Sequence, residues 1–146
     1  MRPRVDRVGR ICFVNWVSVP TADDMRLVTD AIIEARRAAG LPLMLIAIFP
    51  AGGKLPDFEA TNAAVRLMPI VDRLCASQCV VLLGDSLTSA LIRGGVEIGF
   101  AAMRNPGTIV GSIDEAVGSA CLQLGIDPVA VLAEARARGA MEPVTA

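Results

Sequence analysis

Histidine and tyrosine are both absent from this chain of 146 residues. Without histidine the chain has no imidazole base, no histidine ligand for a metal ion and no Ser-His-Asp triad. The cysteines form no Cys-x-x-Cys pair, so the spacing of a zinc site is missing as well. We therefore expect a protein that is not an enzyme and that needs no metal or cofactor. The cysteines lie in apolar segments and are expected to be buried, reduced thiols: Cys12, Cys75, Cys79 and Cys121.

An excess of charge of one sign and long apolar runs are also lacking. The formal net charge is −1, and Lys54 is the lone lysine among the basic residues. Such a balance gives no field that favours nucleic acid or an anionic membrane. No apolar run approaches the ~20 residues of a membrane span. An arginine-rich start followed by an apolar run could suggest a signal peptide, but Asp6, Asn15 and the lack of a cleavage site argue against one. We expect a cytoplasmic protein.

Aliphatic side chains are what the chain has in abundance. Hydrophobic residues make up 53% of it, whereas aromatic residues make up 3%. The length is that of one domain, whose core must be built from Val, Ile, Leu, Ala and Met. The surplus of apolar residues suggests that some of them line a subunit interface or an apolar groove, so a homo-oligomer is expected.

The segment 79–88 is the expected central element of the fold. It reads as a strand that is apolar on both faces, ends at Gly84 and passes into a helix capped by Ser86. A strand that is apolar on both faces must be covered on both faces, as is a central strand in a helix-covered sheet. The remaining segments alternate in type. We expect strands at 4–8, 11–17, 43–49 and 108–110, and helices at about 21–40, 57–75, 87–103, 112–125 and 127–139.

This order predicts an α/β fold with a single mixed, mostly parallel sheet covered by helices. An N-terminal β-hairpin places the first strand antiparallel at one edge. We divide the chain into an α/β domain at 1–125 and a C-terminal helix with a loose tail at 126–146. Two features interrupt the helical patterns and have no assigned role: Pro69, which should kink or split its helix, and Gly94-Gly95, which mark a close contact or a break.

The element order resembles that of STAS domains, the anti-sigma-factor antagonist-like family, over roughly residues 5–124. The resemblance rests on the hairpin Val5-Asp6-Arg7-Val8-Gly9-Arg10-Ile11-Cys12-Phe13-Val14, the helix start Thr21-Ala22-Asp23-Asp24, and the strand Val80-Val81-Leu82-Leu83. It implies a non-enzymatic regulatory module that works through protein partners. The antagonists carry a phosphorylatable Asp-Ser motif after the strand that corresponds to 43–49, where this chain has Pro50-Ala51-Gly52-Gly53. A phosphorylation switch at that place is therefore not expected.

A second interpretation is a carrier or sensor of a small apolar, lipid-like ligand. Other members of the STAS fold bind nucleotides or lipids, and the aliphatic composition fits an apolar ligand. The two interpretations make different predictions, because an interaction module should expose an apolar patch whereas a carrier should enclose a cavity.

A hydrolase is a third and more distant alternative. Gly84-Asp85-Ser86-Leu87-Thr88 resembles the nucleophile block of GDSL-type esterases and follows a strand, as it does in those enzymes. Their serine needs a histidine to accept its proton, and this chain has none. We therefore interpret Gly84 as a strand end, and Asp85 and Ser86 as a helix cap.

The candidate binding residues follow from the expected sheet. Ligands of open α/β sheets bind at the carboxyl ends of the strands, where the loops after 43–49 and 79–83 should meet. We therefore expect Gly53, Lys54, Asp85 and Ser86 to line whatever ligand or partner site exists. The Gly52-Gly53-Lys54 triplet is not a phosphate loop, because the leading glycine and the following Ser or Thr are missing.

Overall fold

The chain opens with a hairpin that forms one edge of the sheet. The computed structural model describes residues 1–84, 87–101, 103, 107–142 and 144. Strands β1 (Arg4–Val8) and β2 (Ile11–Asn15) are joined by a turn at Gly9, whose φ of 58° suits glycine. The elements that follow are α1 (Ala22–Ala39), β3 (Leu43–Phe49), α2 (Phe58–Leu74), β4 (Cys75–Leu82), α3 (Leu87–Ala101), β5 (Thr108–Val110), α4 (Ile113–Leu124) and α5 (Pro128–Ala137).

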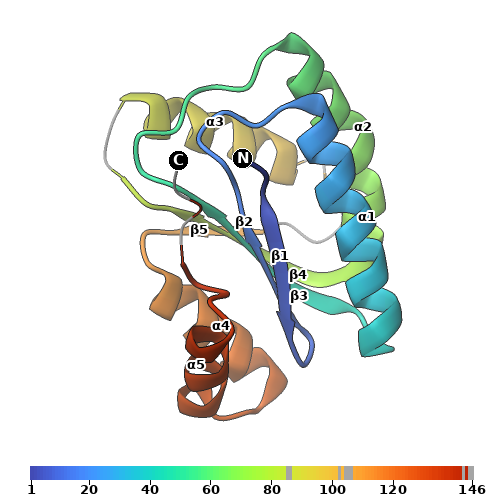
Figure 1. Cartoon of the computed structure of the whole chain (residues 1–146), viewed down its shortest axis with the longest axis vertical. Coiled ribbons are helices and arrows are strands. Elements are labelled where there is room, and N and C mark those ends of the chain that lie inside the picture. Colours follow the sequence, from blue (N-terminus) through green and yellow to red (C-terminus); the bar gives the residue numbers. More distant parts are fainter. Residues whose placement is uncertain (85–86, 102, 104–106, 143, 145–146) are drawn as a thin grey trace.

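The five strands form one mixed sheet in the order β1-β2-β3-β4-β5. β1 pairs antiparallel with β2, and every later pairing is parallel (Figure 1). The α/β class, the mostly parallel sheet and the antiparallel edge strand are thus confirmed. The middle strand of the sheet is β3. The strand that the sequence predicts at the centre is β4, which is the next strand in the sheet order.

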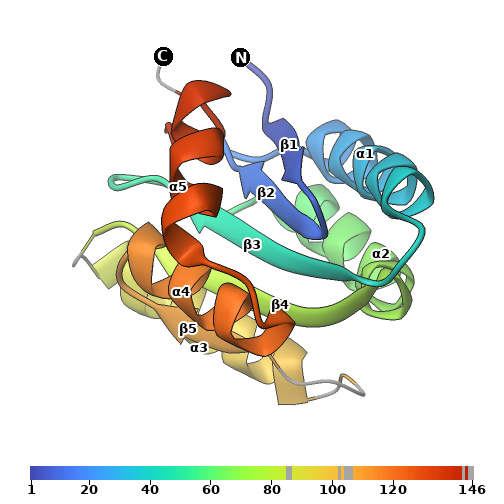
Figure 2. The ribbon, with the colours of Figure 1, turned by 90° about the horizontal axis from the view of Figure 1, so that it is seen from below.

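Helices cover both faces of this sheet (Figures 1 and 2). Cys12 and Val14 on β2 pack with α1 and α2 on one face, which we call face A. Ile11 and Phe13 point the other way and pack with α4 and α5 on face B. This alternation is the period of two that a strand imposes on its side chains. Helix α3 also lies on face A, where Phe100 packs with Val80 and Leu82 of β4.

Local capping explains where the helices begin. The Thr21 hydroxyl accepts from the Asp24 backbone N–H at 3.1 Å, and the Asp24 carboxylate accepts from the Thr21 N–H at 3.0 Å, which is a capping box. The N-caps of α2, α4 and α5 each make one such bond, in which the side chain accepts from a backbone N–H of the first turn. These residues are Asp57, Ser112 and Asp127. All these caps lie where the sequence predicts helix starts.

Helix α2 differs from its prediction in two ways. It runs without a break through Pro69, and β4 begins at Cys75, directly after its last residue. Proline removes the donor that would bond the carbonyl of Val65, four residues earlier. Val65 is 62% exposed, so water can satisfy that carbonyl and the helix can continue.

Gly94 and Gly95 neither break α3 nor mark a close contact. The helix is continuous from Leu87 to Ala101, and a Cβ added at either glycine would meet no described atom within 4 Å. The close contact lies instead at Gly99, where an added Cβ would be 2.7 Å from the Cε of Met68 on α2.

The C-terminal segment is tied to the N-terminal hairpin rather than loose as far as Glu142. Asn15 donates from Nδ2 to the carbonyl of Ala140 at 2.6 Å. The Arg4 guanidinium donates to the carbonyls of Gly139 and Glu142, and Arg138 donates to the carbonyl of Arg7 at 2.8 Å. In Figures 1 and 2 the segment that follows α5 lies beside the N-terminal hairpin. Residues 143, 145 and 146 lie outside the described part.

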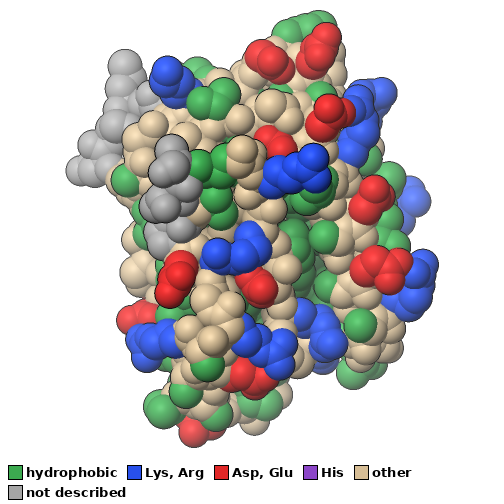
Figure 3. All heavy atoms as spheres, in the orientation of Figure 1, with side chains coloured by type: hydrophobic (Ala, Val, Ile, Leu, Met, Phe, Trp, Pro, Cys, Tyr) green, Lys and Arg blue, Asp and Glu red, His purple; other side chains and the backbone are tan. Residues whose placement is uncertain are grey.

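The surface mixes charges of both signs. On the face shown in Figure 3, Lys and Arg side chains are interspersed with those of Asp and Glu, and hydrophobic side chains lie between them. Among the described helices, none is both long and apolar enough to cross a membrane.

Candidate functional site

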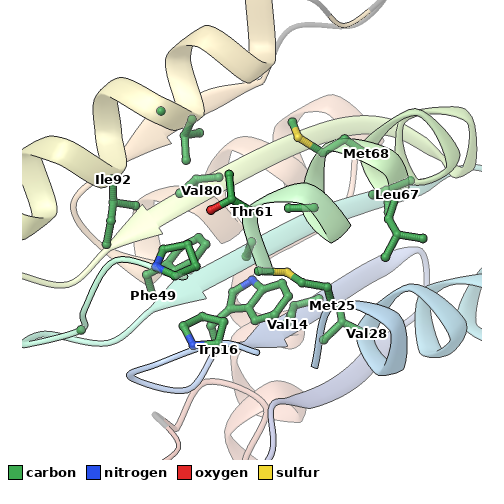
Figure 4. A pocket seen from close by; sticks show the side chains of 18 of the residues that line it. Val14, Trp16, Met25, Val28, Phe49, Thr61, Leu67, Met68, Val80 and Ile92 are labelled. Atoms are coloured by element: carbon green, nitrogen blue, oxygen red, sulfur yellow. The ribbon is translucent and has the colours of Figure 1, made fainter. Parts of the chain in front are cut away.

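The main feature of face A is a cavity of about 520 Å³ between the sheet, α1, α2 and α3. Figure 4 shows side chains from all four sources converging on it: Trp16, Phe49 and Val80 from the sheet side, Met25 and Val28 from α1, Thr61, Leu67 and Met68 from α2, and Ile92 from α3. The volume lies within the ~300–1,000 Å³ that is usual for small-molecule sites. The cavity is therefore large enough to hold a ligand and not merely a packing defect.

The floor of the cavity is a row of strand residues in register. Val14, Ala47 and Val80 lie side by side on β2, β3 and β4 and all line the cavity. Beyond them, Trp16 and Phe49 stack with ring centroids 5.9 Å apart and planes 12° from parallel. Trp16 is held by its backbone N–H, which donates to the carbonyl of Ile48 at 2.9 Å. The floor is thus rigid and apolar.

The walls are unequal. Helices α1 and α2 pack closely on each other, and of the α1 residues that line the cavity Val28 and Ile32 are buried while Met25 is half-buried. On the opposite wall, α3 presents Ile92 and Val96, which are half-buried, and Leu91, which is 52% exposed. The cavity therefore opens on the side of α3.

The mouth is framed by residues that both line the cavity and reach solvent. They come from the loop after β3, from the N-terminal half of α2 and from α3: Lys54, Leu55, Thr61, Val65, Leu91 and Gly95. The loop is anchored at its backbone, because the Lys54 N–H donates to the carbonyl of Ser18 at 2.7 Å. This places the mouth at the carboxyl ends of β2 and β3, as expected for an α/β sheet.

The chemistry of the lining is that of an apolar binding site. Its described residues include no carboxylate, and Lys54 is their one charged side chain. Two hydroxyls inside it are already used, since Thr29 donates to the carbonyl of Met25 and Thr61 to that of Asp57, each at 2.8 Å. A general base or a nucleophile paired with one is not found among these lining residues.

The thiols lie away from the cavity and are unreactive. All four cysteines are free and buried, as predicted, and none lines the cavity. Burial raises the pKa of both Cys12 and Cys75 to about 12, and it raises the pKa of Cys79 and Cys121 as well. Thiols with such pKa values stay protonated at neutral pH and make poor nucleophiles. Within the described part of the chain, no three His, Cys, Asp or Glu residues are grouped to hold a metal ion.

Two of the four residues predicted for the site line this cavity. Lys54 lies at the mouth, and Gly53 lies beside it, where an added Cβ would be 3.4 Å from the carbonyl oxygens of Pro50 and Ser18. Asp85 and Ser86 lie outside the described residues, and so does the centre of the esterase-like motif.

Sequence reasoning missed most of the lining. The sequence places Phe49 only at the end of a strand and gives Trp16 no binding role, yet their stacked rings form part of the floor. Gly95 was noted only as an interruption, yet it lies at the mouth. The surplus of aliphatic residues was the one sequence signal that pointed to an apolar groove.

Comparison of the chain with protein-family models, with curated proteins and with solved structures finds no match. The resemblance to STAS domains therefore stays a prediction, and the functional argument depends on the cavity.

Proposed function

We propose that this protein binds a small, predominantly apolar molecule in the cavity on face A and acts as its carrier or sensor, not as an enzyme. The observation that supports this is a cavity of about 520 Å³ that opens to solvent at its mouth and has an almost wholly apolar lining. Of the two interpretations drawn from the sequence, the carrier was the one that required a cavity. The lining includes side chains from three helices and three strands, so an occupant would stabilise the packing of face A.

Two neighbouring glycines on α3 offer a matched test of this proposal. A Cβ added at Gly94 or at Gly95 would meet no described atom within 4 Å, but Gly95 lines the cavity and Gly94 does not. Replacing either by leucine in a helix interior should stabilise the helix by a similar amount, about 1 kcal/mol. The two variants differ in what they do to the mouth.

The probe for this test is phenylnaphthylamine, a neutral apolar dye whose fluorescence rises in apolar surroundings. We expect the unaltered protein and Gly94→Leu to bind it equally, and Gly95→Leu to bind it at least about tenfold more weakly, the equivalent of ~1.4 kcal/mol. Equal binding by all three proteins, or no binding by any, would count against a ligand cavity. Native mass spectrometry of protein purified gently from its own cells would then identify a natural ligand from its added mass.

A regulatory interaction module that resembles STAS domains is the second candidate. It is favoured by exposed apolar side chains at the turn between α4 and α5, where Leu122 is 84% and Val129 is 70% exposed. Such side chains suit a protein partner or a second copy of this chain. Replacing both by serine should abolish any homo-oligomer seen by native mass spectrometry and leave dye binding unchanged.

A further inference from the structure

The lining of the cavity, from its interior to Thr61 at the mouth, has few polar groups left to recognise a ligand. The Thr29 and Thr61 hydroxyls donate to carbonyls of their own helices, and the Gln78 amide donates to the sulfur of Met103 at 3.5 Å. A donor that is already bonded must lose that bond to serve a ligand, so it contributes little net affinity. Whatever lies deep in the cavity is therefore recognised by its apolar surface.

The mouth is different because of Lys54. It is the lone lysine of the chain and the one charged side chain among the described lining residues. Every ion pair found in the described part of the chain uses an arginine, and no described carboxylate lies within 4.0 Å of the Lys54 ammonium. An exposed cation is thus fixed by its backbone at the rim of an apolar cavity, and none of the carboxylates in the described part of the chain pairs with it.

The geometry points to an anionic amphiphile of the fatty-acid type as the ligand, with its hydrocarbon body in the cavity and its carboxylate at Lys54. This inference rests on the function proposed above. A carboxylate fits better than a phosphate monoester, because one flexible ammonium balances one negative charge. A phosphate would call for further donors of the kind a phosphate loop supplies, and the loop after β3 lacks that pattern.

Close packing of the loop supports this placement. A Cβ added at Gly53 would lie 3.4 Å from the carbonyl oxygens of Pro50 and Ser18, and the Lys54 N–H bond to the Ser18 carbonyl holds the loop over the ends of β2 and β3. The side chain of Lys54 remains exposed. It can therefore reach a head group at the water boundary, while the ligand body stays out of water.

The chain provides its own reporter for a test. Trp16 is its single tryptophan, tyrosine is absent, and the indole lines the cavity. Intrinsic fluorescence therefore reports occupancy of this site without a label. Laurate and dodecanol are the paired ligands, because they share a hydrocarbon chain length and differ in the charge of the head group.

The measured quantity is the ratio of laurate affinity to dodecanol affinity, and how that ratio changes on substitution. We expect Lys54→Met to lower the ratio about two- to fivefold, as expected for an ion pair that water partly screens, and Lys54→Arg to restore it. Added salt should reduce the effect in the unaltered protein. Arg73→Met removes the same charge from an exposed position on α2 outside the lining, and it should leave the ratio unchanged.

The outcomes separate the two proposals. If both ligands bind and the ratio is the same with and without Lys54, the carboxylate assignment is wrong and the apolar cavity remains a binding site. If neither ligand changes Trp16 fluorescence or displaces phenylnaphthylamine, the proposed function itself fails.

Discussion

The two faces of the sheet carry the same kind of aliphatic side chains but are covered in different ways. On face B, alanines of α4 and α5 are fully buried, among them Ala116 and Ala135, and their small size lets the helices lie close to the strands. On face A, α3 is anchored near its C-terminal end by Phe100, whose ring leaves no room for a Cβ at Gly107, whereas Leu91 near the other end is half exposed.

This difference explains why the pocket found on face B is small, about 70 Å³, whereas the cavity on face A is about 520 Å³. Apolar composition alone favours burial on both faces, since the free energy gained depends on the area removed from water. Whether burial also fills the space depends on how closely each helix can approach the sheet. An aliphatic helix anchored mainly at one end leaves space under the other end, and that space can hold a ligand.

The largest difference in stability between the two faces is expected when one phenylalanine is removed from each. Phe13 on face B is completely buried, and Phe13→Ala should lower the free energy of unfolding by about 3–5 kcal/mol, because it creates a new void in a filled core. Phe49 is half-buried and lines the cavity, so Phe49→Ala should cost only about 1–2 kcal/mol, most of it from the lost ring stacking. Urea denaturation of both variants measures the difference, and equal costs would contradict it.

A smaller effect is expected when a ring is added instead of removed. Ala116→Phe forces a large side chain between α4 and the sheet and should destabilise the protein by about 1–3 kcal/mol. Ala47→Phe extends from the floor into the cavity and should leave stability within about 0.5 kcal/mol of the original. The same Ala47→Phe variant should lose phenylnaphthylamine binding. Strong destabilisation by Ala47→Phe would show that face A is already filled in solution.

The remaining effect concerns the thiols of face A, which do not alter stability through titration at neutral pH and do so only at alkaline pH. Folding raises the pKa of Cys12 and Cys75 from 9.0 to about 12, chiefly through burial. Between these values the unfolded chain loses a proton that the folded chain keeps. The contribution of each thiol to the free energy of unfolding is therefore fully present below pH 9. It should fall by up to about 1.4 kcal/mol per pH unit for each thiol as the pH rises toward 12.

The double variant Cys12→Ala, Cys75→Ala tests this dependence. It should be less stable at neutral pH, because two small voids form, but its stability should fall less steeply between pH 9 and 12. Denaturation curves over that range give the slope. An unchanged slope would mean that other groups control alkaline unfolding.

Much of the fold could be predicted from the sequence because its signals are local. The period of two on β2, the capping residues Thr21 and Ser112, and the terminal Gly40 each act within a few residues, and the structure confirms the elements that they predict. The abrupt passage from α2 to β4 at Cys75 could not be predicted, because no Gly or Pro marks it. At Pro69 the helix is not split, because the exposed position of Val65 lets water donate to the carbonyl that proline leaves without a donor.

The cavity could not be predicted for a different reason. The distance of α3 from the sheet depends on contacts between remote residues, such as Gly99 with Met68 and Phe100 with Gly107. No periodic pattern in one segment encodes that distance. Gly53 and Lys54 could be placed at the carboxyl end of β3 because that placement relied on a property of the whole fold class, the binding of ligands at strand carboxyl ends. Their role in binding stays a prediction.

The bonds between the hairpin and the C-terminal segment have a consequence for how the protein is made. Arg4 and the carbonyl that it binds at Gly139 are 135 positions apart, and Asn15 and Ala140 are 125 apart. These bonds cannot form until nearly all of this sequence has left the ribosome. Until residues 139–142 have been synthesised, the first hairpin lacks these bonds. The Asn15 Nδ2 then has no Ala140 carbonyl to bind, and the sheet face that α5 covers in the complete fold is exposed. A nascent chain stalled before residue 139 should therefore be markedly more open to protease at the hairpin than the completed one.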